Sequence, residues 1–120
     1  AGMRALRAGE VDAYLAVSDV IAANQAQLII DTARVKRLPT IFDQTSFVIK
    51  GGLATYSVSL HEVGRLSAKY VQRILAGVKP KDIPVEGVDK IELVINLKTA
   101  KQIGVTIPAS VLARADRVIK

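Results

Sequence analysis

The feature that most constrains the fold is the alternation, from Val11 onward, of short apolar runs with longer amphipathic segments. Runs that suit β-strands occupy residues 12–17, 40–42, 53–57 and 91–95. The first run is apolar between polar flanks, which predicts a strand covered on both faces. Segments with helical spacing follow at residues 20–36 and 59–76. Strands and helices that alternate over short connections form βαβ units, so we predict an α/β fold with a parallel sheet flanked by helices.

The helix boundaries follow from capping residues and breakers. Ser18 and Asp19 can cap the first long helix, and Pro39 stops it. Residues 43–50 form a short helix or a loop, which Gly51-Gly52 ends. The second long helix ends at Gly77 and has one apolar and one charged side. Its apolar side holds Leu60, Val63, Ser67, Tyr70, Val71 and Ile74, and its charged side holds Glu62, Arg65, Lys69 and Arg73.

After residue 77 the regular alternation of strands and long helices ends. Residues 78–90 are an extended, proline-containing linker or crossover. Asn96 can cap a helix that runs to Gly104, and Pro108 suits the first turn of a last helix. Residues 1–8 resemble the last turns of a helix with Gly9 at its end, without a start signal before them. We therefore expect residues 1–120 to be a single α/β unit that is the C-terminal part of a longer protein.

Composition excludes several classes of protein. The chain has no cysteine, so disulfides, thiolate metal sites and thiol catalysis are excluded. Its net charge of +6 comes from scattered basic residues, and only 4% of residues are aromatic, which argues against a nucleic-acid partner. The densest basic cluster, Arg34, Lys36 and Arg37, lies at a helix end, where cations favour the helix dipole more readily than they form a phosphate site. No apolar run approaches the roughly 20 residues that span a bilayer, and no signal segment is present.

Catalytic motifs are also missing. His61 is the only histidine, and a single histidine in an amphipathic helix makes no metal site. Gly51-Gly52 lacks the spacing and the lysine of a phosphate-binding loop. No serine lies in a nucleophile elbow, and the aspartates form no paired carboxylate motif. We therefore predict that the chain is not an enzyme and uses no metal and no cofactor.

A placement rule predicts where a ligand would bind. In open parallel sheets, ligands lie beyond the carboxyl ends of the strands, where loops present hydroxyls, carboxylates and free helix N–H groups. These positions offer carboxylates for an ammonium group and rings for an apolar group, which suits a small polar or amino-acid-like ligand. The alternative is that Phe42 belongs to the core and that Ser18, Asp19 and Ser59 only cap helices. The candidate ligand-binding residues are Ser18, Asp19, Phe42, Asp43, Tyr56, Ser57 and Ser59.

Four segments carry a resemblance to a known family. They are Gly51–Ala54, Tyr70–Pro80 (YVQRILAGVKP), Asp82–Glu86 (DIPVE) and Glu92–Ala100 (ELVINLKTA). The chain resembles, over nearly its whole length, the C-terminal region of ABC-type substrate-binding proteins, some of which are linked to aromatic amino acids. The resemblance implies a type I periplasmic binding protein fold, in which two α/β lobes joined by crossover strands close on a ligand.

This resemblance also bears on individual residues. Ser18-Asp19 matches a position where relatives place polar groups that face the ligand. Position 59 departs from the pattern, because relatives that bind amino acids often have an aspartate there and this chain has Ser59. The helix at 59–76 would pack on the other lobe, so the isolated chain would expose that helix and form a homo-oligomer.

Two function classes follow from the resemblance. In the first, the parent protein is periplasmic or anchored outside the cytoplasmic membrane, and it captures a small-molecule solute for an ABC permease. In the second, the same fold is the effector-sensing domain of a cytoplasmic transcription regulator. Sequence upstream of Ala1 distinguishes them, since a signal segment supports the first and a helix-turn-helix supports the second.

Overall fold

The structure is a computed structural model that describes residues 2–5, 7, 9–17 and 20–120, and the chain divides into two compact units. The sheet unit comprises Ala1–Ser57 and Glu92–Lys120, and the helical unit comprises Val58–Ile91. The sheet unit contains α1 (Gly2–Ala5), β1 (Tyr14–Leu15), α2 (Val20–Asn24), α3 (Ala26–Val35), β2 (Thr40–Phe42), α4 (Thr45–Ile49), β3 (Ala54–Val58), β4 (Ile91–Asn96), α6 (Leu97–Ile103), α7 (Ala109–Leu112) and β5 (Arg117–Ile119). The helical unit contains α5 (Leu60–Leu75) and a 3₁₀ turn, η1 (Pro80–Asp82).

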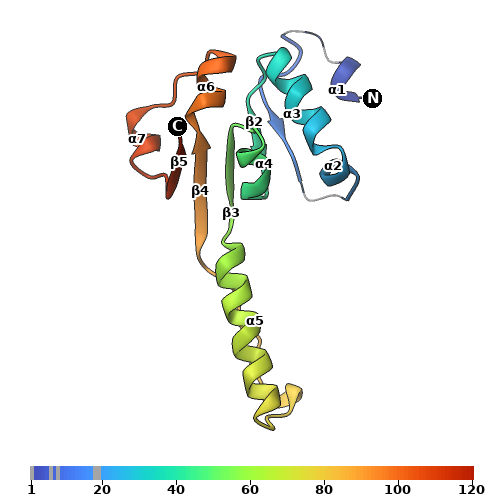
Figure 1. Cartoon of the computed structure of the whole chain (residues 1–120), viewed down its shortest axis with the longest axis vertical. Helices are drawn as coiled ribbons and strands as arrows, with labels where there is room; N and C mark the ends of the chain where they lie inside the picture. The colour runs from blue at the N-terminus through green and yellow to red at the C-terminus, as the bar shows by residue number, and fades with distance from the viewer. Residues whose placement is uncertain (1, 6, 8, 18–19) are drawn as a thin grey trace. The chain divides into compact units, whose positions relative to one another are not determined.

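Five strands pair in the order β1-β2-β3-β4-β5, as Figure 1 shows. β1 pairs with β2 in parallel, and β2 with β3, where Phe42 lies level with Thr55. β4 and β5 are also parallel to each other. The α/β fold class and the flanked, mostly parallel sheet are therefore confirmed.

One strand pair is antiparallel. The Asn96 N–H donates to Leu53 O (2.8 Å), and the Ser59 N–H donates to Lys90 O (3.0 Å). Later residues of β3 therefore pair with earlier residues of β4, so the two strands run in opposite directions. The cause lies in the helical unit, where the segment after α5 returns alongside the helix: Tyr70 Oη donates to Pro84 O (2.9 Å) and accepts from the Glu86 N–H (2.7 Å). The connection does not return to the end of the sheet where β3 begins. β4 therefore starts beside the last residues of β3 and runs antiparallel to it.

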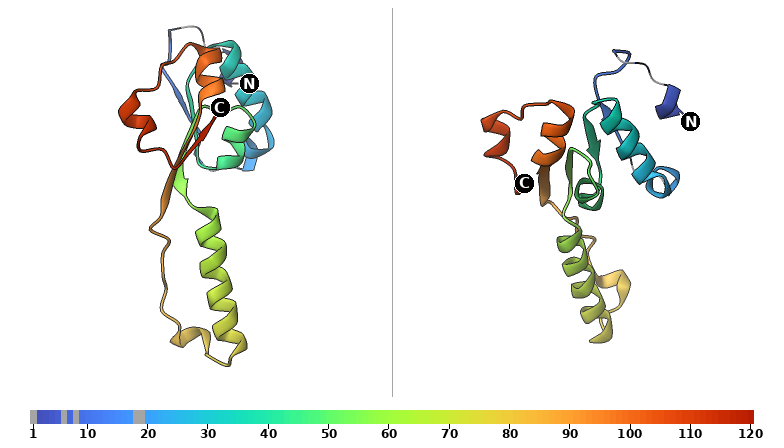
Figure 2. Two further views of the ribbon diagram at one scale, coloured as in Figure 1. Left: turned by 60° about the vertical axis from the view of Figure 1, so that its left-hand side comes forward. Right: turned by 45° about the horizontal axis from the view of Figure 1, so that its top comes forward.

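The core of the sheet unit lies on the side of β1 to β3 that α3 and α4 cover (cyan and green in Figure 2). Phe42 and Phe47 pack there with Ala16 and with Ala26, Ile29 and Ile30 of α3. Ala33 of α3 is also buried. A second cluster joins Leu53 to Ala100 and Ile103 of α6. The prediction that residues 12–17 form a strand covered on both faces is wrong, because Leu15 is 68% exposed and only Tyr14–Leu15 is strand.

The helices agree with most predicted boundaries, but the first long helix is broken, and Pro108 precedes α7 as its N-cap instead of lying in its first turn. The first long helix is interrupted between α2 and α3, where the Gln25 N–H bonds to Ala22 O three residues back rather than four. α5 begins at the predicted cap, since Ser59 Oγ accepts the Glu62 N–H. Asn96 caps α6 as predicted, and Gly104 ends it in the left-handed conformation with φ 76°.

Candidate functional site

A cavity of about 230 Å³ opens where β1 and β2 end. Its apolar lining combines small residues with two aromatic rings, and its polar lining comes from the two residues that follow β2. The lining residues are Ala16, Val17, Val20, Ala22, Ala23, Phe42, Asp43, Gln44 and Phe47. The cavity therefore lies at the carboxyl ends of parallel strands, where the placement rule predicts a ligand site.

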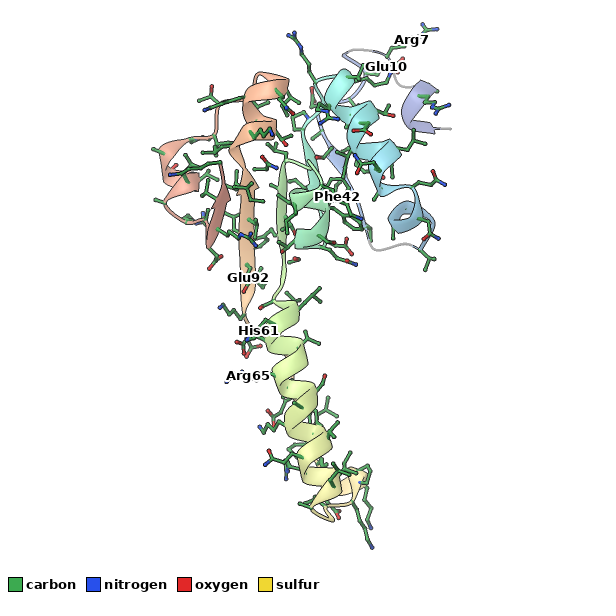
Figure 3. All side chains as sticks on the ribbon, in the orientation of Figure 1. Arg7, Glu10, Phe42, His61, Arg65 and Glu92 are labelled. Carbon is green, nitrogen blue, oxygen red and sulfur yellow. The ribbon has the colours of Figure 1, made fainter. Side chains whose placement is uncertain are left out.

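Two phenylalanines form the aromatic wall of the cavity. The Phe42 and Phe47 ring centroids are 5.3 Å apart with planes at 50°, and Tyr14 adds a third ring 6.4 Å from Phe42. Tilted rings at these separations attract each other, so the three rings hold one another in place. Figure 3 labels Phe42 at the end of β2, where its ring is 3% exposed. Phe42 therefore belongs to the core, as the alternative states, and it also lines the cavity; its contact with a ligand stays a prediction.

The polar side of the cavity consists of Asp43 and Gln44, both partly exposed. Gln44 precedes α4, and its Oε1 lies 3.5 Å from Ser46 Oγ. A carboxylate and an amide beside an apolar wall can receive the charged or polar head of a small molecule whose apolar part contacts the rings.

A hydrogen-bond network fixes the backbone behind the aromatic wall. Thr99 Oγ1 donates to Gly51 O (3.0 Å), and Thr40 Oγ1 accepts the Leu53 N–H (3.0 Å). Asn96 Nδ2 donates to Val48 O (3.0 Å), while the Gly52 N–H donates to Phe47 O (2.9 Å). The connection from α4 to β3 is therefore bonded on both sides of Gly52. Among the described residues, no buried side-chain N or O atom lacks a hydrogen-bond partner.

The structure brings two of the seven predicted residues to the cavity, Phe42 and Asp43. Ser18 and Asp19 lie outside the described residues, between the lining residues Val17 and Val20 in the sequence. Tyr56 is 61% exposed and is not part of the lining.

The other two predicted residues have local hydrogen-bond partners. Ser57 Oγ lies 3.0 Å from Thr55 Oγ1. Ser59 is 2% exposed and caps α5, which is the structural role that the sequence left open for it.

Sequence reasoning missed Phe47 and the small residues of the lining. Phe47 lies in a segment that the sequence left open between helix and loop, and its inward direction depends on α4 being a helix. The alanines Ala16, Ala22 and Ala23 carry no chemical signal of their own. Only their position beside Phe42 makes them lining residues.

The described residues offer neither a metal site nor a membrane-spanning helix. No group of three or more His, Asp or Glu side chains there could hold a metal ion. In the part of the chain that the structure describes, no helix combines the length and apolar character needed to cross a bilayer. His61 lies exposed on α5, where Figure 3 labels it.

The chain is similar to one protein family and to several solved structures. Residues 3–119 match the model of a family described as ABC transporter substrate binding protein, which is a family of binding proteins rather than of enzymes. The structure of a conserved domain protein from Vibrio cholerae O1 biovar El Tor is 33% identical with a TM-score of 0.82, over 91% of this chain and 37% of that one. The structure of an ABC domain from Streptococcus pneumoniae in complex with L-Trp is 34% identical with a TM-score of 0.82, over 92% of this chain and 37% of that one.

A curated relative is more distant. The tyrosine-binding protein of Clostridioides difficile (strain R20291) is 25% identical over 93 residues, which are 78% of this chain and 27% of that protein. The chain thus spans less than a third of the length of the curated relatives it matches.

Proposed function

Because the chain belongs to the ABC transporter substrate binding protein family, we propose that it is the C-terminal part of a two-lobed protein that captures a small organic solute. The parent protein acts outside the cytoplasmic membrane and delivers the solute to an ABC permease. Capture requires only closure of two lobes around the ligand and no bond chemistry. This agrees with the missing catalytic motifs of the sequence.

The observation that carries the proposal is the cavity at the ends of β1 and β2. An aromatic wall, Phe42 and Phe47, stands beside the polar pair Asp43 and Gln44. A ligand with a flat or branched apolar part and a charged head satisfies both sides of such a cavity. The 230 Å³ available is small for a complete site, which suits one half of a site that a second lobe closes.

We assign an amino acid with an apolar or aromatic side chain as the ligand class. The relatives described as an L-Trp complex and as a tyrosine-binding protein support this class for the chain. The side chain of the ligand would contact the rings of Phe42 and Phe47, and its ammonium group would pair with Asp43 and with the predicted residue Asp19.

Ligand-dependent stabilisation of the full-length protein tests the proposal. At 100 times Kd, a ligand that binds only the folded state stabilises it by about 2.7 kcal/mol, which a thermal melt detects readily. We expect L-tryptophan, L-tyrosine or a branched apolar amino acid to raise Tm. The solute-capture proposal fails when no amino acid, nucleoside or small organic anion in such a screen raises Tm.

Two substitutions locate the site. Phe42→Leu keeps an apolar core residue but removes the ring, and it should weaken binding of an aromatic amino acid about 10-fold. Asp43→Asn keeps the shape of the side chain but removes the charge, so binding should weaken by about 10-fold for amino acids and remain for acids that lack the ammonium group. Val35→Ala, on an exposed position of α3, is the matched control and should leave affinity unchanged.

A further inference from the structure

We infer that Gly52 is a positioning residue that sets the depth of the cavity, because the space its missing side chain leaves is filled by the Phe42 ring. The ring position in turn limits the size of the apolar group that the cavity admits. This inference rests on the proposed function, since it assumes that the cavity receives the ligand.

The contact between Gly52 and Phe42 leaves no room for a methyl group. A Cβ atom on Gly52 would lie 2.6 Å from Phe42 Cε2, 2.7 Å from Phe42 Cδ2 and 3.0 Å from Phe47 O. Carbon atoms in ordinary contact are about 3.5–4.0 Å apart, so an alanine here requires a displacement of about 1 Å. Either the backbone at position 52 or the ring of Phe42 has to move.

The backbone is the part that is held. The Gly52 N–H donates to Phe47 O (2.9 Å), and Gly51 O accepts Thr99 Oγ1 (3.0 Å). On the other side, the Leu53 N–H donates to Thr40 Oγ1 (3.0 Å) and Leu53 O accepts the Asn96 N–H (2.8 Å). Moving this segment by 1 Å would break several buried hydrogen bonds, each of which is costly to leave unmade.

The ring has one open direction. Phe47 and Tyr14 flank it at centroid distances of 5.3 Å and 6.4 Å, which opposes sideways movement. The Phe42 ring is in contact with the Cβ position of Gly52 and also lines the cavity, which Gly52 does not. The displacement that relieves a contact at position 52 therefore carries the ring into the 230 Å³ of open space.

Selectivity for ligand size follows from this arrangement. A ring that advances by about 1 Å removes space from the deep, apolar part of the cavity and leaves Asp43 and Gln44 in place. Gly52→Ala should therefore weaken binding of large apolar amino acids by about 10-fold or more, with little change for small ones, because an apolar pocket discriminates by roughly 10- to 200-fold per methylene-sized change.

The test measures affinities of the full-length protein by calorimetry for L-tryptophan, L-tyrosine, L-valine and L-alanine. We expect Gly52→Ala to lower the affinity ratio of tryptophan to alanine at least about 10-fold. The double variant Gly52→Ala/Phe42→Leu removes the ring that the methyl group displaces, and it should bring the ratio closer to that of Phe42→Leu alone. Gly87→Ala, at a glycine with no atom within 4 Å of its Cβ position, is the matched control and should leave the ratio unchanged. An unchanged ratio in Gly52→Ala overturns the inference.

A crystal structure of the Gly52→Ala variant gives a readout that does not depend on the ligand. A Phe42 ring moved towards Ala16 and Ala22 over an unmoved 51–53 backbone supports the inference, whereas a moved backbone under an unmoved ring overturns it. Where Gly52→Ala fails to fold and the double variant folds, the ring is again the group that must give way. Where neither variant folds, the clash of the new methyl group with Phe47 O, and not with the ring, prevents folding, and the inference is wrong.

The two proposals fail in different ways. A full-length protein that binds none of the amino acids contradicts the proposed function, while the crystal structure still decides what Gly52 does to the ring. Normal binding that is insensitive to Gly52→Ala contradicts only the inference.

Discussion

At the scale of single residues, Asn96 connects two parts of the sheet unit and is 4% exposed. Its Oδ1 accepts the Thr99 N–H (3.0 Å) at the start of α6, and its Nδ2 donates to Val48 O (3.0 Å) at the end of α4. Asn96→Ala removes a helix cap and leaves the Val48 carbonyl without its donor, so we expect a loss of about 2–3 kcal/mol in the free energy of unfolding.

Urea denaturation measures this loss, and a second substitution at position 96 separates the contributions of the two hydrogen bonds. Asn96→Ser keeps a capping oxygen for the Thr99 N–H but is too short to reach Val48 O, so its loss should be smaller than that of alanine. Asn24→Ala, at an exposed position at the end of α2, controls for the removal of an asparagine. A loss below about 0.5 kcal/mol for Asn96→Ala would show that neither bond stabilises the fold.

The same residue marks how far sequence reasoning reaches. The capping role of Asn96 was predictable because cap and helix are adjacent in the sequence. Its bond to Val48 spans 48 positions, and no local pattern encodes it. Gly52 is a similar case: the sequence marks a break in the chain, while its contact with the Phe42 ring exists only once β2 and β3 are paired.

At the scale of elements, strands and helices were predictable where periodicity and caps agree. β2, β3, α5 and α6 lie close to their predicted bounds for this reason. β5 was missed because Arg117–Ile119 is too short to show a period, and its strand character comes from pairing with β4. The antiparallel direction of β4 was also out of reach, since it depends on the path of residues 78–90 rather than on their composition.

That path depends on a contact within the helical unit, and a substitution can test it. Tyr70→Phe removes both the bond to Pro84 O and the bond from the Glu86 N–H. We expect the Glu86 amide to exchange with solvent at least about 5-fold faster, because each of the two lost hydrogen bonds is worth about 1 kcal/mol net and the segment opens locally. Hydrogen exchange followed by mass spectrometry or NMR measures the rate.

A comparison variant separates hydrogen bonding from charge. Lys69 Nζ bonds both Glu86 carboxylate oxygens (2.8 and 2.9 Å), but both side chains are partly exposed, at 51% and 36%. Exposed ion pairs contribute about 0–1 kcal/mol, so Lys69→Ala should accelerate exchange less than Tyr70→Phe does. The opposite order would mean that the ion pair, and not the tyrosine, holds the returning segment.

At the scale of the whole molecule, α5 carries an apolar side that nothing within the helical unit buries. None of its residues is buried, and Leu60, Val71 and Ile74 are 66%, 55% and 45% exposed. A helix with such a side normally packs against a partner surface. In the proposed two-lobed protein the other lobe supplies that surface, whereas the 120-residue chain alone has to supply it from a second copy.

We therefore expect the isolated 120-residue chain to associate in a concentration-dependent manner in sedimentation velocity experiments. Val63→Ser/Val71→Ser reduces the apolar area of α5 without adding charge, and it should shift the chain towards monomer by weakening a contact that is driven by apolar burial. Arg73→Ser changes the opposite side of the same helix and should leave association unchanged. In the proposed two-lobed protein the other lobe would cover α5, so the full-length protein should be insensitive to concentration. A monodisperse wild-type monomer at all concentrations would contradict this account, since α5 would then need no partner.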